Sequence, residues 1–199
     1  MEKGIREPKQ QRSIEKKERI IRAAYELFSE KGYYSTVTPD IAKRAGVSTG
    51  IVYGYFADKR DILSYVLKIY IREMASPLME YVQGLPKEIS LAEIFENVIS
   101  LAESLHKKNA NLHNILHSLA SVDEGINGEF LSLEKHITES ATQTFSSRGI
   151  NTDRLAEKIH IAMNLIQSYA HEAIYDKHDY LDYDSMRKSV VEILVKLFN

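Results

Sequence analysis

Apolar residues recur every three to four positions along most of this chain, which is the spacing expected for amphipathic helices. Between residues 14 and 31, for example, Ile20, Ala24, Leu27 and Phe28 share one helical face. No segment alternates strictly between apolar and polar residues, as a half-buried strand does. The pattern therefore predicts an all-α protein of about nine helices.

Proline, glycine and capping residues set the expected limits of these helices. All four prolines lie before residue 87, and only three glycines interrupt the chain after that point. Short polar side chains that accept hydrogen bonds from a first helical turn are the expected N-caps: Thr38, Ser48, Asp58, Asp153 and Asp184. The predicted helices span about residues 14–31, 38–46, 48–56, 58–82, 91–107, 110–121, 128–147, 153–177 and 184–198.

Residues 37–56 combine two short helices with a tight connection. Gly46 is placed where the chain must leave the first helix with a positive φ, and Ala42 is small where the second helix approaches. Apolar residues follow at the packing positions: Ile41, Val47 and Val52. This spacing indicates a helix-turn-helix, with Thr49, Tyr53 and Tyr55 on its exposed face.

The residues around this motif extend it. Residues 21–33 read IRAAYELFSEKGY, followed at fixed spacing by Thr36, Ile41-Ala42, Ala45 to Ser48, Gly50, Tyr53, Tyr55-Phe56, Lys59 and Leu63. Over residues 14–63 the chain thus resembles the TetR family of bacterial transcriptional repressors. The resemblance implies a three-helix DNA-binding domain over 14–63 with its helix-turn-helix at 37–56, and a helical effector-binding and dimerisation domain over 64–199. The charged residues 1–13 are expected to form a flexible arm.

The resemblance also implies which residues face a DNA operator. They lie in the two short helices and at the start of the next one: Thr38, Pro39, Lys43, Ser48, Thr49, Gly50, Ile51, Tyr53, Tyr55 and Lys59. Three residues depart from the family's pattern. Val37 replaces a common capping serine or threonine, which is expected to move the cap to Thr38. Thr49 replaces a frequent basic residue, and Gly54 replaces a bulkier one and lowers helix propensity by about 1 kcal/mol.

Charge is divided unevenly along the chain. Residues 1–63 carry 13 lysines and arginines against nine acidic residues, whereas the remainder carries 13 against 19. This asymmetry suggests that the two parts meet different partners, although a chance scatter of charge is the alternative.

The composition excludes several classes of protein. The chain has no cysteine, which excludes disulfides, thiol catalysis and thiolate zinc sites and fits a reducing cytoplasm. No apolar stretch approaches the roughly 20 residues of a membrane span. The N-terminal residues are charged and polar and include no apolar segment, so we do not expect them to form a signal peptide. We therefore expect a cytoplasmic protein without a membrane partner.

Two Glu-x-x-His pairs repeat the spacing found in di-iron bundles. They are Glu103 with His106 and Glu157 with His160. Their positions around the helix place both pairs on outward faces, where no shared site can form. The chain also lacks an ordered catalytic triad, a phosphate-binding loop and a convergent carboxylate pair. We therefore expect no metal, no cofactor and no enzymatic activity.

The last predicted helix has an apolar arc of about 200°, wider than the stripe of about 100° that covers one core. The excess predicts a second buried surface, formed with the 153–177 helix as a four-helix dimer interface of the kind the family implies. Burial inside one monomer is the alternative. The expected interface residues are Ile159, Met163, Ile166, Met186, Val190, Ile193, Leu194 and Leu197.

The resemblance further implies an effector pocket in the larger domain. Its expected lining is Tyr70, Met74, Leu78, Phe95, Ile99, His113, Leu116, His117 and Tyr169. An aromatic and methionine-rich lining suits a largely apolar ligand with one or two polar anchors, although the same residues suit an ordinary core. His113 and His117 are four residues apart and able to share a metal, but we expect His113 to make a polar contact in the pocket or a backbone hydrogen bond.

Together these features predict a dimeric repressor that a small molecule releases from a palindromic operator. The alternative is a ligand-insensitive DNA-binding protein or a transcriptional activator. A helical-bundle enzyme comes third.

Overall fold

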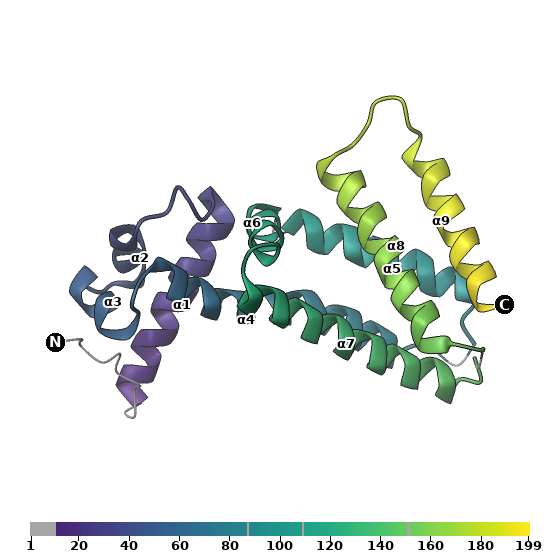
Figure 1. The fold of residues 1–199 in the computed structure, drawn as a ribbon, viewed down its shortest axis with the longest axis horizontal. Helices are drawn as coiled ribbons and strands as arrows, with labels where there is room; N and C mark the ends of the chain where they lie inside the picture. The colour runs from purple at the N-terminus through teal and green to yellow at the C-terminus, as the bar shows by residue number, and fades with distance from the viewer. Residues whose placement is uncertain (1–10, 87, 109, 151) are drawn as a thin grey trace. The chain divides into compact units, whose positions relative to one another are not determined.

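The structure, a computed structural model, describes residues 11–86, 88–108, 110–150 and 152–199, and all regular secondary structure in these ranges is helical. The helices are α1 (Gln11–Lys31), α2 (Thr38–Ala45), α3 (Thr49–Tyr55), α4 (Lys59–Gln83), α5 (Leu91–Lys108), α6 (Ala110–Ala120), α7 (Glu124–Ser147), α8 (Leu155–Tyr175) and α9 (Tyr183–Phe198) (Figure 1). The predicted all-α fold of about nine helices is confirmed. Most of the predicted arm, residues 1–10, lies outside the described residues, whereas residues 11–13 belong to α1.

The chain divides into two compact units. Unit 1 comprises the described residues of 1–72 and 109–127, and unit 2 comprises those of 73–108 and 128–199. The boundary therefore falls inside α4, and α6 belongs with the N-terminal helices because it packs on α1. The boundary predicted from the sequence is residue 63 instead, since a pairing between α1 and α6 leaves no local signal in the sequence.

Unit 1 is built around α1, which packs against α2 and α6. Gly46 ends α2 in the left-handed region, with φ 67° and ψ 39°, as the sequence predicts. The N–H of Val47 then bonds to the carbonyl of Ala42 at 3.0 Å, which closes the turn before α3. The large side chains that are fully buried in this unit include Ile20, Phe28, Ile41, Phe56, Ile62, Leu63, Tyr70, Leu112 and Leu116.

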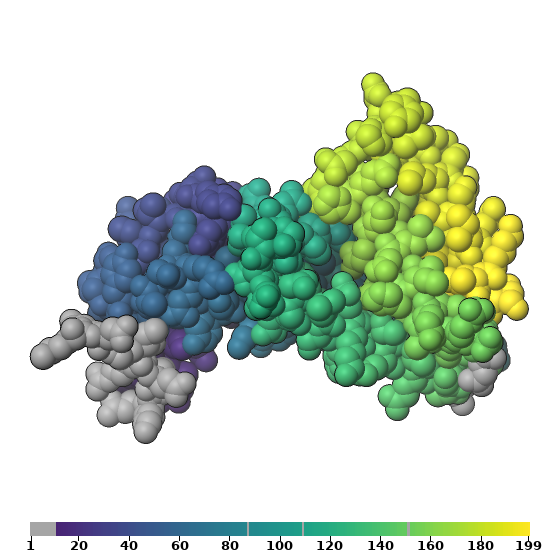
Figure 2. Space-filling model, viewed as in Figure 1, coloured from purple at the N-terminus to yellow at the C-terminus, as the bar shows by residue number. Residues whose placement is uncertain are grey.

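Unit 2 is a helical bundle in which α5 packs against α8 and α9, and α8 packs against α9. The loop of residues 176–182 joins α8 to α9 and projects beyond the helices (Figures 1 and 2). Arg187 ties α9 to α5, because its guanidinium bonds to Glu96 at 2.8 Å and to Glu103 at 3.1 Å. The core of this unit includes Ile94, Phe95, Ile99, Ile159, Ile166, Tyr169, Val190, Leu194 and Phe198.

The predicted cap of α2 is wrong by one residue. Val37, not Thr38, occupies the N-cap position, with φ −112° and ψ 154°. A valine side chain accepts no hydrogen bond, so the first turn is completed from the other direction: the carboxylate of Asp40 accepts the N–H of Val37 at 3.4 Å. Thr38 becomes the first helical residue and is buried.

The predicted caps of α8 and α9 are also wrong. Arg154 is the N-cap of α8 and adopts a left-handed conformation with φ 56°, so Asp153 lies before the helix. Asp182 caps α9, because its carboxylate accepts the N–H groups of Asp184 and Ser185 at 3.0 and 3.3 Å. Asp184 therefore lies in the first turn of α9, where its negative charge suits the helix dipole.

Candidate DNA-binding surface and ligand cavity

One face of α3 is open to solvent while the opposite face is anchored in unit 1. Val52 is 1% exposed, whereas Tyr53, the next residue, is 56% exposed. Most of the residues expected to read DNA share the open face: Ser48, Gly50, Ile51 and Tyr53 are exposed, and Thr49 is half-buried. A short helix held on one side and open on the other is the arrangement that a major groove accepts.

The remaining predicted DNA contacts differ in their exposure. Pro39 and Lys43 are exposed on α2, whereas burial leaves Thr38 little surface for DNA. Tyr55 is half-buried, and its hydroxyl lies 2.6 Å from the hydroxyl of Ser13 on α1. This hydrogen bond holds the end of α3 against the start of α1.

Lys59, expected to contact phosphate, is engaged inside unit 1. Its Nζ donates to the carbonyl oxygens of Tyr33 at 2.8 Å and Thr36 at 2.9 Å, and it lies 4.2 Å from the centre of the Tyr33 ring. Burial lowers the pKa of Lys59. Two of the three donors of the ammonium group thus join α4 to the α1–α2 connection, which leaves one for any other partner.

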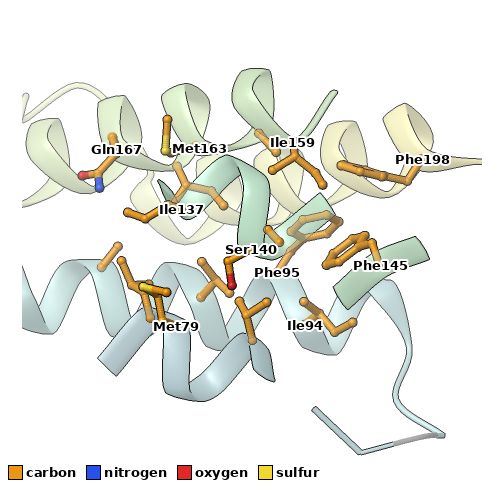
Figure 3. Close-up of a pocket in the computed structure, with 17 residues that line it drawn as sticks. Met79, Ile94, Phe95, Ile137, Ser140, Phe145, Ile159, Met163, Gln167 and Phe198 are labelled. Carbon is orange, nitrogen blue, oxygen red and sulfur yellow. The ribbon is translucent and has the colours of Figure 1, made fainter. Parts of the chain in front are cut away.

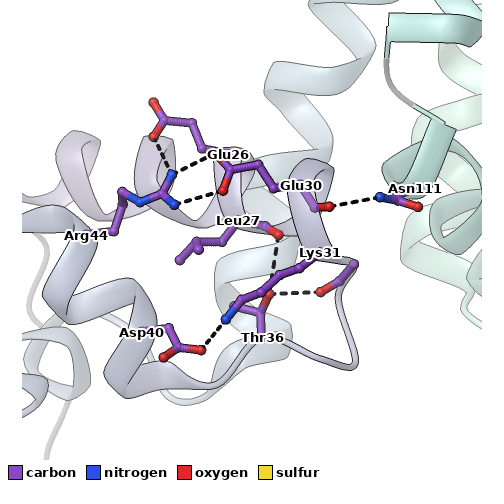
Figure 4. Close-up of polar contacts among 9 residues, drawn as sticks. Glu26, Leu27, Glu30, Lys31, Thr36, Asp40, Arg44 and Asn111 are labelled. Carbon is purple, nitrogen blue, oxygen red and sulfur yellow. Dashed lines mark hydrogen bonds and ion pairs between the residues drawn. The ribbon is translucent and has the colours of Figure 1, made fainter.

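Ion pairs fix α2 against the end of α1 (Figure 4). Arg44 bonds to the two carboxylate oxygens of Glu30 at 2.9 and 2.8 Å and also contacts Glu26 at 3.3 Å. Lys31 pairs with Asp40 at 2.6 Å. These exposed pairs are each worth little in stability, about 0–1 kcal/mol. Their consequence for DNA binding is electrostatic, because they neutralise two cations beside the helix-turn-helix.

Hydrogen bonds of Thr36 and Asn111 also hold this corner. The hydroxyl of Thr36, which is 0% exposed, donates to the carbonyl of Gly32 at 2.8 Å. Asn111 of α6 donates its amide to the carbonyls of Ser29 and Glu30 at 2.8 and 3.3 Å, which satisfies carbonyls near the end of α1 (Figure 4). The α1–α2 corner is therefore held from both sides within unit 1.

Unit 2 encloses a cavity of about 90 Å³ between α4, α5, α7, α8 and α9 (Figure 3). Phenylalanine rings form one end of it: Phe198 lies 5.5 Å from Phe95 and 5.4 Å from Phe145 between ring centres. Ser140 and Gln167 are the polar residues in a lining that holds no charged side chain. Such a cavity suits an uncharged, largely apolar molecule.

The cavity uses few of the residues predicted for it. Leu78 and Phe95 line it, whereas Met74, Ile99 and Tyr169 are buried in unit 2 outside its wall. Most of the lining was missed because it comes from residues that the sequence pattern assigns to ordinary core or to a dimer interface. The missed residues include Met79, Val82, Ile137, Ser140, Ala141, Phe145, Gln167 and Phe198.

Four other predicted pocket residues lie in unit 1. Tyr70, His113 and Leu116 are buried there, and the hydroxyl of Tyr70 lies 2.7 Å from Nδ1 of His113. His117 is exposed, with its ring centre 4.2 Å from that of His113. The prediction that these residues line a cavity with Phe95 is wrong, because α6 packs on α1 rather than on the helices of unit 2. The polar contact of His113 is thus with Tyr70 in unit 1 and not with a group that lines the cavity.

The predicted dimer interface needs correction at half of its positions. Four residues are buried within the chain itself and offer no surface to a partner: Ile159, Ile166, Val190 and Leu194. Their apolar face is covered by the bundle of unit 2, which explains part of the wide apolar arc of α9. Ile193 is 54% exposed, and Met163, Met186 and Leu197 are half-buried. Ile161 of α8 is also exposed and was not predicted.

The two Glu-x-x-His pairs do not both face outward. His106 is buried, and its Nδ1 donates to the carbonyl of Ala102 at 2.8 Å. Glu103 pairs with Arg187 at 3.1 Å. Among the described residues, no three histidine or carboxylate side chains are grouped as in a metal site. No helix in the described part of the chain is long and apolar enough to cross a membrane.

Comparisons with known proteins agree with this geometry. Residues 20–66 match the family model described as bacterial regulatory proteins, tetR family. The transcriptional regulator HbdR of Aromatoleum sp. is 47% identical over 75 residues, which is 38% of this chain and 30% of that protein. The regulator AcrR of Shigella flexneri is 30% identical over 116 residues, 57% of this chain and 54% of that protein. The matched regions thus span at most about half of these relatives.

A solved structure shares the fold along nearly the whole chain. A TetR-family transcriptional regulator from Mesorhizobium loti has a TM-score of 0.73 and covers 95% of this chain and 97% of its own length, at 20% sequence identity. The described chain therefore has the fold of a helix-turn-helix regulator, with α3 as an exposed helix of the motif. Over residues 20–66 the chain is thus similar to the tetR family of bacterial regulatory proteins, and over nearly its whole length it shares the fold of a TetR-family regulator.

Proposed function

We propose that this chain is a dimeric repressor that binds a palindromic DNA operator and is released from it by a largely apolar small molecule. The exposed face of α3 carries the DNA-binding part of this proposal, since α3 lies inside the segment that matches the family. Base edges in the major groove specify sequence, and short polar groups such as Thr49 and Ser48 are able to contact them.

The dimeric part rests on exposed apolar side chains in unit 2. Ile161 of α8 and Ile193 of α9 are each more than half exposed, and these two helices pack against one another. Association would remove such groups from water, a gain of roughly 25 cal/mol per Å² of apolar surface. A twofold dimer also matches a palindromic operator, whose half-sites are about 34 Å apart or a multiple of that distance.

The ligand-responsive part rests on the cavity of unit 2. Its wall includes residues from α4, the helix whose first residue, Lys59, is tied to the α1–α2 connection. A molecule that displaces the α4 side chains Leu78 or Met79 would act on the same helix that enters the DNA-binding unit. A shift in the spacing of two α3 helices weakens operator binding without changing α3 itself.

Selection of binding sites from random DNA tests the DNA-binding part. We expect one enriched palindrome, and Thr49→Ala should narrow the gap between this site and mismatched DNA by about 1–3 kcal/mol per half-site. Ser35→Ala, at an exposed position outside α3, is the matched control and should leave specificity unchanged. Failure to enrich any site would contradict the proposal.

A panel of uncharged apolar compounds tests the ligand-responsive part by thermal stabilisation and by release of the selected DNA. Ala162 lines the cavity and is buried, so Ala162→Leu should fill it and abolish both responses. Ala156→Leu, at an exposed position on the same helix, should leave both intact. Equal responses from the two variants would place the ligand elsewhere, and no response from the native protein to any compound would favour a ligand-insensitive regulator.

A further inference from the structure

The surface expected to read DNA carries little positive charge of its own. α3, from Thr49 to Tyr55, holds no charged residue. Most cations in or beside the helix-turn-helix are occupied: Arg44 and Lys31 form ion pairs, and Lys59 bonds to two backbone carbonyls. Lys43 of α2 is exposed and forms no ion pair within 4.0 Å in the described part of the chain. Contacts between cations and phosphates supply most of the sequence-independent affinity of DNA-binding proteins. One such lysine neutralises about one phosphate, so a further source of this affinity is expected elsewhere in unit 1.

A groove between α1 and α4 of unit 1 holds the required charge. Its volume is about 940 Å³, and six cations line it together with two carboxylates, Glu15 and Glu18. The cations are Arg12, Lys16, Arg19 and Arg22 of α1 and Lys68 and Arg72 of α4. The lining therefore has an excess of four positive charges. All six side chains are exposed.

These cations differ from most of those beside the helix-turn-helix in their pairing. None of the six forms an ion pair within 4.0 Å with a carboxylate in the described part of the chain. The four of α1 recur at intervals of three or four residues, which places them along one side of the helix. From Arg12 to Arg22 they extend about 15 Å along the helix axis, at 1.5 Å per residue.

The groove begins beside the recognition helix. Ser13, next to Arg12, lies 2.6 Å from the hydroxyl of Tyr55 at the end of α3. Lys17 links α1 to α4, because its Nζ donates to the hydroxyl of Tyr65 at 2.8 Å and lies 4.1 Å from the centre of that ring. The end of α3 therefore lies beside the start of this row of cations.

We propose that the α1–α4 groove is a second DNA-binding surface, which holds the phosphate backbone of the duplex beyond the segment that α3 reads. Duplex DNA carries one negative charge per 1.7 Å of its axis, so a row of cations about 15 Å long faces several phosphates. Continuity with α3 favours DNA over an acidic protein as the occupant. Phosphate contacts carry no sequence information, so the groove adds affinity and not specificity. The inference rests on the proposed DNA binding.

The test uses the four cations of the groove farthest from α3, replaced together as Arg19→Gln, Arg22→Gln, Lys68→Gln and Arg72→Gln. Binding to a 40-base-pair duplex with the selected operator, and to one of random sequence, is followed by fluorescence anisotropy at several KCl concentrations. We expect affinity for both duplexes to fall at least tenfold at low salt, with their ratio unchanged. The log–log salt slope should decrease by about 0.9 for each phosphate that the variant no longer neutralises.

Two further variants separate this effect from net charge. Lys107→Gln, Lys135→Gln, Lys188→Gln and Lys196→Gln make the same change in charge at exposed positions of unit 2 and should leave the salt slope nearly unchanged. Glu15→Gln with Glu18→Gln removes the groove's two carboxylates and should raise affinity for both duplexes. Circular dichroism and melting curves check that each variant folds.

The possible results distinguish a failure of the groove inference from a failure of the proposed DNA binding. Suppose that the native protein binds DNA and that the groove variant has the same salt slope and DNA affinity as the unit 2 variant. The groove is then not a DNA-binding surface, and an acidic protein becomes the favoured occupant. If the groove variant loses affinity only for the operator duplex, the groove acts in specificity and the inference is wrong. If the native protein binds neither duplex at low salt, the proposed function itself fails.

Discussion

The two units place their candidate sites in opposite environments. In unit 1 the site is a surface: α3 exposes Tyr53 to solvent while Val52, beside it, is buried. In unit 2 the site is an interior, a cavity walled by apolar side chains of α4, α5, α7, α8 and α9. Duplex DNA has a nearly constant shape, so a surface that binds it needs its contact residues at a fixed spacing along the chain. A cavity needs only enough apolar volume around its ligand.

The difference explains which unit is recognisable. The match to the family model covers residues 20–66, all within unit 1, whereas the cavity lies in unit 2. The helix-turn-helix depends on about 20 consecutive residues, while the lining of the cavity is spread from Leu78 to Phe198. Substitutions that separate surface from interior are therefore the sharpest tests of the comparison.

The largest effect is expected in α9, where neighbouring residues face opposite ways. Leu194 is 0% exposed in the core of unit 2, so Leu194→Asp buries an unpaired charge and should lower the free energy of unfolding by about 4 kcal/mol or more. Ile193 is exposed, so Ile193→Asp should leave the fold intact and dissociate a dimer. Urea unfolding and light scattering measure the two effects, and equal loss of stability in both variants would contradict the assignment.

A second test concerns the corner that supports the surface of unit 1. Thr36→Val keeps the shape of a fully buried side chain but leaves the carbonyl of Gly32 without its 2.8 Å bond. An unsatisfied buried group costs about 1–3 kcal/mol, so we expect a loss of this size in urea unfolding. Ser64→Ala, which removes a hydroxyl from an exposed position of α4, should be near neutral. A neutral Thr36→Val would show that water replaces the missing bond.

A third test compares two glycines of the helix-turn-helix. Gly46 has a φ of 67°, so Gly46→Ala strains the turn and should destabilise unit 1 by about 1–2 kcal/mol. Gly54 lies inside α3, and a methyl group there meets nothing within 4 Å. Gly54→Ala should therefore stabilise the protein by about 0.5–1 kcal/mol. Thermal melts of both variants measure these shifts, and shifts of the same sign would be inconsistent with the structure.

The smallest effect is a pH dependence in unit 2. Burial lowers the pKa of His106 in the folded protein, although its bond to Ala102 opposes this shift. The unfolded chain then binds the extra proton first, so stability is full above about pH 6.5 and falls as the pH drops toward the folded pKa. The slope is at most about 1.4 kcal/mol per pH unit for one proton.

The variant His106→Asn measures this contribution by difference. Urea unfolding of both proteins at pH 5.5 and 7.5 should show a weaker pH dependence in the variant, because the variant lacks this buried imidazole. Identical pH dependence in the two proteins would show that His106 does not contribute to the pH dependence of stability. The measurement extends the comparison to unit 2, whose interior tolerates little charge.

Local patterns were enough to predict the helices and the DNA-binding motif. Apolar spacing is a property of neighbouring residues, so it located nine helices to within a few residues at most ends in the described part of the chain. Gly46 needed only its own backbone conformation to end α2. Capping was less predictable, because Asp182 and Asp184 are chemically alike and the chain direction before α9 decides which of the two accepts the first N–H groups.

Tertiary structure alone decided which helical faces meet. The apolar residues of α9 look alike in sequence, yet Leu194 is buried and Ile193 is exposed because α5 and α8 cover only part of the apolar arc. His113 belongs to unit 1 and does not line the cavity of unit 2, because α6 packs on α1. The cations of the groove become one site only when α1 and α4 lie together. Such pairings join residues far apart in the chain, and burial of apolar surface favours any pairing that fills space, so only the folded arrangement selects one.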